Sequence, residues 1–170
     1  MNIPQLETFR LILRPFTQGD VEPLHRILGI PGVLQYFPNS DTPGLDRVKR
    51  LVQRQINHWS EFNYGWWAVE TKTGSGLIGW SGLQYLPETN ETEIGYLFAK
   101  PYWGQGLASE SASAGLDYGF TRLKIPEIVG IVHPENIASR RVLEKIGLKH
   151  QEQAEYFGMV CEKYLIKNPY

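Results

Sequence analysis

The feature that most constrains the fold is a set of three β-rich segments in the middle of the chain. Residues 66–69, 77–83 and 93–98 are dominated by aromatic and aliphatic side chains, and stretches of Gly, Thr, Asn and Pro separate them. Runs of this composition, joined by turn residues, predict strands that pair with their neighbours in an antiparallel meander. The sequence therefore predicts a sheet built around these three segments.

The N-terminal part of the chain predicts one more strand. Apolar and polar side chains alternate over residues 9–14, which is the period-two pattern of a half-buried strand, and Pro15 ends the run. The buried face of this strand would carry Phe9, Leu11 and Leu13.

Two helices are predicted after this strand. Residues 17–20 have the spacing of a capping box, and apolar residues recur at helical intervals from Val21 to Leu28. In the second helix Thr42 would be the N-cap and Pro43 would lie in the first turn. The apolar stripe of this helix comprises Val48, Val52, Ile56 and Trp59.

The last third of the chain alternates between helices and strands. Small residues fill a predicted helix after Gly104, and residues 128–132 are a continuous apolar run suited to a central strand. A helix is predicted over residues 137–146, and two weaker strands would flank Gly158. Because the chain has 170 residues and neither a repeat nor a linker, we expect one domain of the α+β class over its whole length.

The composition argues against several classes of protein. The chain has seventeen Lys and Arg residues and eighteen Asp and Glu residues. The resulting net charge of −1 argues against nucleic acid as a partner. The basic stretch from Arg47 to Arg54 can equally be the solvated side of an amphipathic helix. A single cysteine, Cys161, can form neither an intramolecular disulfide nor a zinc site.

The sequence also predicts neither a membrane segment nor a metal site. No signal-peptide pattern and no stretch of the ~20 apolar residues of a membrane span occurs, so we expect a cytoplasmic protein without a membrane partner. The four histidines lack the spacing of metal ligands. His133, at the end of the predicted central strand, is expected to pack or to lie at the surface.

Two glycine motifs have the form of phosphate-binding loops, and their contexts differ. The G-x-G-x-x-G pattern at residues 74–79 opens a strand rather than a helix, so a hairpin turn explains it better than a dinucleotide site. Gly104 and Gly106 lie between a strand and a helix, where N–H groups and the helix dipole favour an anion. No Lys-Ser or Lys-Thr follows Gly106, which argues against a P-loop NTPase. Alone, this pair fits a strand-to-helix turn as well as a binding loop.

Four segments together resemble the GNAT acetyltransferases, specifically the branch related to ribosomal-protein N-terminal acetyltransferases. They occur in the family's order and are residues 8–15, 93–98, 103–108 and 136–148. The likeness extends from Glu7 to Ile166. It implies the GNAT (acyl-CoA N-acyltransferase) fold, in which helices flank a mixed and mostly antiparallel sheet. It also implies an N-acetyltransferase that uses acetyl-CoA.

The resemblance implies an acetyl-CoA site with three parts. The backbone of Leu97 and Phe98 would pair with the pantetheine arm like an added strand. Asn136 would hold the reacting region with its side-chain amide, and it can also be a helix N-cap. Main-chain N–H groups of the glycine loop would hold the pyrophosphate, although this chain has Trp where the family most often has Gln or Arg. That loop comprises Trp103, Gly104, Gln105, Gly106, Leu107, Ala108 and Ser109.

The resemblance also implies direct attack of an amine on the thioester within a ternary complex. Glu93 is the candidate base, and the alternative is a solvated charge at a strand end. Ser139 is the candidate acid, because Leu143 stands where many family members carry a proton-donating Tyr. A capping or packing role explains Ser139 equally well. If both groups are weak, positioning of a neutral amine can supply most of the rate.

Aromatic residues are expected on the side of the acetyl-CoA site where the acceptor amine enters. Such a wall suits an apolar chain or a cationic amine. The acceptor would be a peptide N-terminus or a small-molecule amine, and the enzyme a monomer or a homodimer. The alternative is an acyl-CoA-binding protein of the same fold that has lost catalysis. The predicted acceptor-side residues are Tyr36, Phe37, Trp80, Tyr85 and Tyr156.

Overall fold

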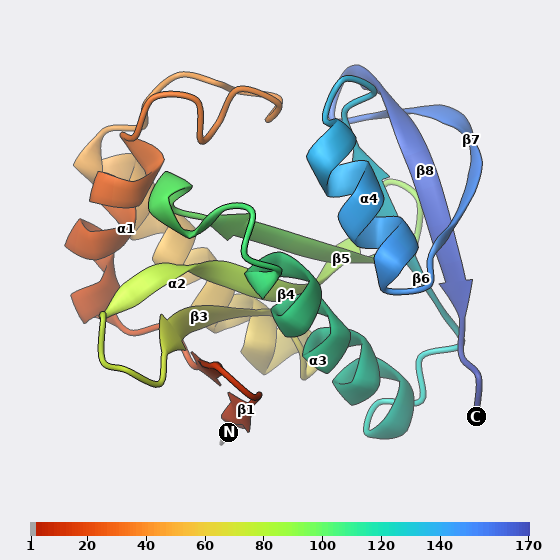
Figure 1. Ribbon diagram of the computed structural model, residues 1–170, viewed down its shortest axis with the longest axis horizontal. Helices are drawn as coiled ribbons and strands as arrows, with labels where there is room; N and C mark the ends of the chain where they lie inside the picture. Colours follow the sequence, from red (N-terminus) through yellow and green to blue (C-terminus); the bar gives the residue numbers. More distant parts are fainter. Residues whose placement is uncertain (1–2) are drawn as a thin grey trace.

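A mixed sheet forms the centre of the structure. The computed structural model describes residues 3–170, in which eight strands follow the order β1-β2-β3-β4-β5-β6-β8-β7 (Figure 1). Each neighbouring pair is antiparallel except β5 and β6, which are parallel. The predicted mixed and mostly antiparallel sheet, with its central meander, is therefore confirmed. The strands are β1 (Leu6–Glu7), β2 (Leu11–Arg14), β3 (Trp66–Thr71), β4 (Leu77–Leu86), β5 (Glu91–Phe98), β6 (Glu127–Val132), β7 (Lys149–Tyr156) and β8 (Met159–Lys167).

Helices cover both faces of this sheet (Figure 1). Apolar residues of α1 and α2 pack with Trp80 and Leu97 on one face. Leu116 of α3 packs with Leu83 and Ile94 on the other face. Among residues 3–170, no helix is long and apolar enough to cross a membrane. The helices are α1 (Val21–Leu28), α2 (Leu45–Phe62), α3 (Leu107–Thr121) and α4 (Ile137–Lys145), and the 3-10 turns are η1 (Gln18–Asp20) and η2 (Lys100–Tyr102).

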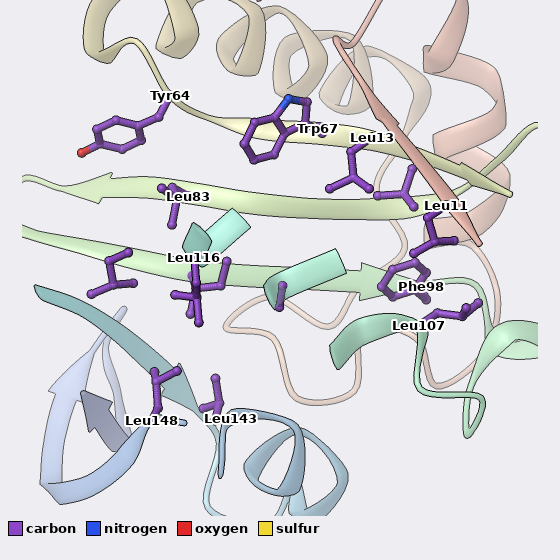
Figure 2. Packing of buried hydrophobic residues seen from close by; sticks show 14 of the residues in the cluster. Leu11, Leu13, Tyr64, Trp67, Leu83, Phe98, Leu107, Leu116, Leu143 and Leu148 are labelled. Carbon is purple, nitrogen blue, oxygen red and sulfur yellow. The ribbon is translucent and has the colours of Figure 1, made fainter. Parts of the chain in front are cut away.

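The small residues of α3 allow this helix to lie close to the sheet. A Cβ atom at Gly115 would lie 3.1 Å from Ile94 Cδ1, and one at Gly119 would lie 2.9 Å from Leu83 Cδ1. Figure 2 shows Leu83 and Leu116 within the apolar cluster that fills this interface. This close packing places α3 directly against β4 and β5.

The N-terminal strand is shorter than the sequence predicts. Strand β2 begins at Leu11, and Phe9 is 91% exposed, so the prediction that Phe9 is buried is wrong. The reason is a tight turn between β1 and β2, in which the Thr8 N–H donates to the Leu11 carbonyl (3.0 Å). Phe9 lies at the tip of that turn, where no sheet neighbour covers it.

The second helix also begins later than predicted. Gly44 is its N-cap and Leu45 its first residue, so Thr42 and Pro43 lie outside the helix. The predicted stripe is otherwise correct, because Val48, Val52 and Trp59 are buried. The glycines of residues 74–79 lie in the turn before β4 and at its start, as the hairpin interpretation requires.

Candidate active site

A cavity of about 930 Å³ lies where strands β5 and β6 separate. These parallel strands make one bridge, between Glu93 and Val129, and β7 and β8 run at a steep angle to β3, β4 and β5 (Figure 1). Beyond the bridge, β5 therefore has a free edge. The cavity is bounded by this edge, by the start of α3, by α4 and by the segment between α1 and α2.

The free edge of β5 exposes the backbone of alternate residues. The Ala99 N–H donates to the Ile78 carbonyl of β4 (2.8 Å), and a Cβ at Gly79 of β4 would collide with the Leu97 carbonyl oxygen. Backbone groups of successive residues in a strand point in opposite directions. The backbone of Leu97 is therefore directed at β4, and that of Tyr96 and Phe98 at the cavity.

The glycine loop leads from β5 into the first turn of α3. Gly104 and Gly106 have φ angles of 71° and 79°, a left-handed conformation that glycine adopts without strain. Gly106 is the N-cap of α3 and offers no side chain to the N–H groups of the first turn. A Cβ at Gly104 would meet nothing within 4 Å, so the loop leaves open space. Unsatisfied N–H groups beside open space suit a phosphate.

Most of the predicted loop residues border the cavity, and two do not. Those on the cavity wall are Trp103, Gly104, Gly106, Leu107 and Ala108. The Trp103 indole donates to the Phe98 carbonyl (2.7 Å) and so ties the loop to the end of β5. Gln105 points away and donates to the Pro101 carbonyl (3.0 Å), and Ser109 is buried.

Glu93 has an unusual electrostatic setting on the cavity wall. Burial, with a smaller effect of the neighbouring Glu91 carboxylate, raises the pKa of Glu93 to about 8. Burial would raise the pKa of Glu91 too, but hydrogen bonds from Lys163 (2.5 Å) and Tyr156 (2.6 Å) lower it. The Glu91 and Glu93 carboxyl groups therefore differ in protonation state. Glu91 is an ion-paired carboxylate, while Glu93 holds a proton that it can exchange near neutral pH.

A second pair of polar groups lies on the α4 side of the cavity. The Tyr96 hydroxyl is 2.8 Å from Ser139 Oγ, and either oxygen can donate. The Ser139 N–H donates to Asn136 Oδ1 (3.1 Å), so Asn136 is the N-cap of α4, and both residues line the cavity. Burial raises the pKa of Tyr96, which keeps its proton at neutral pH. The sequence does not single out the Tyr96 side chain, because Tyr96 is three residues from Glu93 in β5 and an odd separation in a strand puts two side chains on opposite faces.

Aromatic side chains also line the cavity. Tyr36 stacks on the ring of His133 with centroids 5.3 Å apart, so His133 faces the cavity rather than solvent or the core alone. Trp80 stacks on Trp66 at 3.7 Å and meets the edge of Phe37 at 6.5 Å. Tyr36, Phe37 and Trp80 thus line one cavity, together with Trp66 and His133.

The structure does not bring Tyr85 and Tyr156 into this cavity. Tyr85 is five residues after Trp80 in β4, and an odd separation in a strand puts two side chains on opposite faces. Its hydroxyl donates to Asn90 Oδ1 (2.9 Å). Tyr156 is buried beside Val129 and Cys161. The sequence predicted the strands that carry Tyr85 and Tyr156, but not the face of the sheet to which each side chain points.

Other side chains of the described residues give no sign of a metal centre. No group of three or more His, Cys, Asp or Glu within residues 3–170 could hold a metal ion. Cys161 is a buried thiol whose pKa is raised by burial, which makes it a poor nucleophile.

Comparison with known proteins identifies relatives of the whole fold. The profile of the acetyltransferase (GNAT) domain matches residues 10–149. The uncharacterized protein YkkB of Bacillus subtilis is 35% identical over 156 residues, 87% of each chain. The uncharacterized N-acetyltransferase YoaA of the same organism is 31% identical and covers 87% of this chain and 84% of its own.

Solved structures agree with these sequence matches. A crystal structure of an acetyltransferase from Agrobacterium tumefaciens has a TM-score of 0.86 at 26% identity and covers 98% of this chain and 95% of its own. RimL, a ribosomal-protein α-N-acetyltransferase solved in complex with coenzyme A, has a TM-score of 0.80 at 21% identity and covers 98% of each chain. At that identity the likeness to RimL concerns the fold.

Proposed function

The chain belongs to the GNAT acetyltransferase family, and from this premise we propose that it moves an acetyl group from acetyl-CoA to a primary amine by direct attack in a ternary complex. The acceptor is the α-amino group of a polypeptide or a small-molecule amine. We also propose that the chain belongs to the branch of the ribosomal-protein N-terminal acetyltransferases, on the basis of the four segments at residues 8–15, 93–98, 103–108 and 136–148. The chain acts as one domain.

The residues along the β5 edge and the glycine loop fit acetyl-CoA. The open cradle at Gly104 and the N–H groups at the start of α3 suit the pyrophosphate. The backbone of Tyr96 and the N–H of Phe98 face the cavity and suit the pantetheine amides, since the Phe98 carbonyl is taken by Trp103. The Leu97 side chain lines the wall between them. When bound, acetyl-CoA supplies the thioester carbonyl.

Glu93 receives the proton of the acceptor amine in this proposal. An amine attacks only when it carries a lone pair, and a base with a pKa near the working pH transfers protons efficiently. The raised pKa of Glu93, about 8, meets that requirement better than an exposed glutamate would. The observation that carries the proposal is that one cavity joins the carboxyl group of Glu93 to the free edge of β5 and to the glycine loop.

The Tyr96–Ser139 pair donates the proton that the leaving CoA thiolate requires. Both hydroxyls lie on the cavity wall, and the hydrogen bond between them allows one to be reprotonated by the other. Leu143 is buried and apolar, and it packs against Gly130, so it cannot take this role. Asn136 fixes the position of Ser139 through its N-cap bond.

Tyr36, Phe37 and Trp80 form the acceptor-side wall, together with Trp66. Ring faces attract a cationic amine and also pack against an apolar side chain. Glu93 lines the same cavity as these rings, so an amine held by them would be in a position to lose its proton there.

The test is release of free CoA thiol with a panel of N-terminal peptides and small amines. Initial rates measured with both substrates varied should give intersecting double-reciprocal lines, the pattern of a ternary complex. Parallel lines with a trapped acetyl-enzyme would contradict direct attack. Acetyl-CoA binding without thiol release for any amine would favour the alternative, a binding protein without catalysis.

A further inference from the structure

A second hollow, which we call the α2–β4 groove, lies beside the candidate active site. It has a volume of about 700 Å³ and lies between the exposed side of α2 and the end of β4. No part of the proposed reaction uses it. The residues that define it here are Arg50, Arg54, Asn57, Glu61, Gln84 and Tyr85.

The α2–β4 groove is continuous with the reaction cavity. Arg54 and Gln84 line both hollows. Gln84 lies directly opposite Glu93 in the β4–β5 ladder, and side chains of such neighbours start about 5 Å apart. An acceptor polypeptide that leaves the reaction cavity past Glu93 would therefore enter the α2–β4 groove with its next residue.

The groove carries unpaired positive charge. Arg50 and Arg54 are one helical turn apart, and within residues 3–170 neither makes an ion pair with a carboxylate. Like charges at this spacing destabilise a helix slightly, and a bound anion would offset that effect. Glu61 is the acidic residue of the groove, so the arginines outnumber it.

His58, which also lines the groove, does not add to its positive charge. Its Nδ1 is 2.7 Å from the Tyr64 carbonyl, to which it must donate, and its Nε2 accepts from the Tyr85 N–H (3.2 Å). That pattern requires the neutral ring, and burial lowers the pKa of His58 accordingly.

The length of the groove suits a short extended peptide. From Arg50 to Glu61 the helix rises about 16 Å at about 1.5 Å per residue. An extended chain advances about 3.3 Å per residue, so about five residues would fill that length.

We propose that the α2–β4 groove binds the residues that follow the reactive amine of a polypeptide acceptor, and that Arg54 and Arg50 select acidic side chains there. This inference rests on the proposed acetyl transfer to a polypeptide α-amino group. RNA is the less suitable occupant, because two arginines beside a glutamate are a small basic surface and RNA has no amine of the kind that the cavity would deprotonate.

The experiment compares two hexapeptides that share their first two residues and carry Glu or Gln at positions three to five. For the unmodified enzyme at low salt, kcat/KM should be roughly fivefold higher for the acidic peptide, since two exposed ion pairs each contribute a small factor. The double variant Arg50→Gln, Arg54→Gln should bring that ratio close to one. Arg47→Gln is the matched control, because Arg47 lies on the same helix and lines neither hollow, and it should leave the ratio unchanged.

A binding measurement separates this inference from the proposed function. Fluorescence anisotropy of the labelled acidic peptide, in the presence of CoA, needs no acetyl transfer. Binding that the double variant weakens by roughly the same fivefold factor, and that Arg47→Gln retains, supports the inference about the groove even if no acetylated product forms. If both peptides are acetylated with equal kcat/KM, and the double variant does not change that ratio, the inference about the groove is overturned and the proposed function stands. Displacement of the peptide by a single-stranded RNA that binds more tightly also overturns it.

Discussion

Arg10 and Glu110 are 100 residues apart in the sequence and form an ion pair with two hydrogen bonds next to the glycine loop. Glu110 Oε2 accepts from Arg10 Nε (2.7 Å), and Glu110 Oε1 accepts from the Arg10 N–H (2.7 Å). Arg10 Nη1 also donates to the Gln105 carbonyl (2.8 Å). The turn between β1 and β2 thereby fixes the loop in which Gly104 and Gly106 lie.

Arg10→Ala should therefore weaken acetyl-CoA binding. Without the guanidinium the Gln105 carbonyl loses its partner, and the loop must be ordered on binding. Since a hydrogen bond to a charged group contributes about 1.5–3 kcal/mol when buried and less when half-exposed, we expect roughly a tenfold higher KM for acetyl-CoA. Steady-state kinetics checks this. Lys72→Ala removes an exposed ion pair with Glu7 on the same sheet edge and is the control. An equal rise in the acceptor KM would contradict a specific effect on the loop.

Glu93→Gln should lower kcat by about 100-fold or more, the usual contribution of a general base. In the unmodified enzyme, kcat/KM should rise with pH until Glu93 ionises near its raised pKa of about 8. The variant should lose that inflection, apart from titration of the amine itself. A variant that keeps both the rate and the inflection would exclude Glu93 as the base.

The same substitution should change how stability depends on pH. The unfolded carboxyl ionises near its ordinary pKa of 4.5, while the folded one keeps its proton to about 8. Between these values the folded state binds more protons, so the free energy of unfolding falls as pH rises. Glu93→Gln should thus gain stability relative to the unmodified protein between pH 5 and pH 9. Thermal unfolding at both pH values measures this, and a constant difference in Tm would contradict it.

Tyr96→Phe and Ser139→Ala should each reduce kcat and leave the KM for acetyl-CoA nearly unchanged. Each removes one of two hydroxyls that are 2.8 Å apart, so the effects of the two substitutions should be far from additive. A double-mutant cycle on kcat tests this. Full additivity would mean that the hydroxyls act separately, and no loss in either variant would assign the pair to structure.

Tyr36→Ala should raise the acceptor KM severalfold without changing the affinity for acetyl-CoA, because Tyr36 lies on the aromatic wall with His133. Tyr156→Phe is the informative contrast. Tyr156 is buried and its hydroxyl donates to Glu91, so its loss should lower stability by about 1 kcal/mol and leave the acceptor KM unchanged. A higher acceptor KM in Tyr156→Phe would mean that the acceptor reaches beyond the cavity described above.

Much of the fold could be predicted from local pattern. The three β-rich segments became β3, β4 and β5, and the small residues after Gly104 became α3, since side-chain period and glycine context act over a few residues. The errors at Phe9 and Thr42 lie at element ends. There, pairing between β1 and β2 and the conformation of Gly44 decide the boundary.

The sequence by itself determined which elements form and which backbone segments could approach acetyl-CoA, because motif spacing along the chain reports local conformation. Only the tertiary structure decided what faces the cavity. It separated Tyr85 and Tyr156 from Tyr36, paired Tyr96 with Ser139, and buried Glu93 enough to raise its pKa. Solvation and contacts between strands distant in sequence set these properties, and no local pattern encodes them.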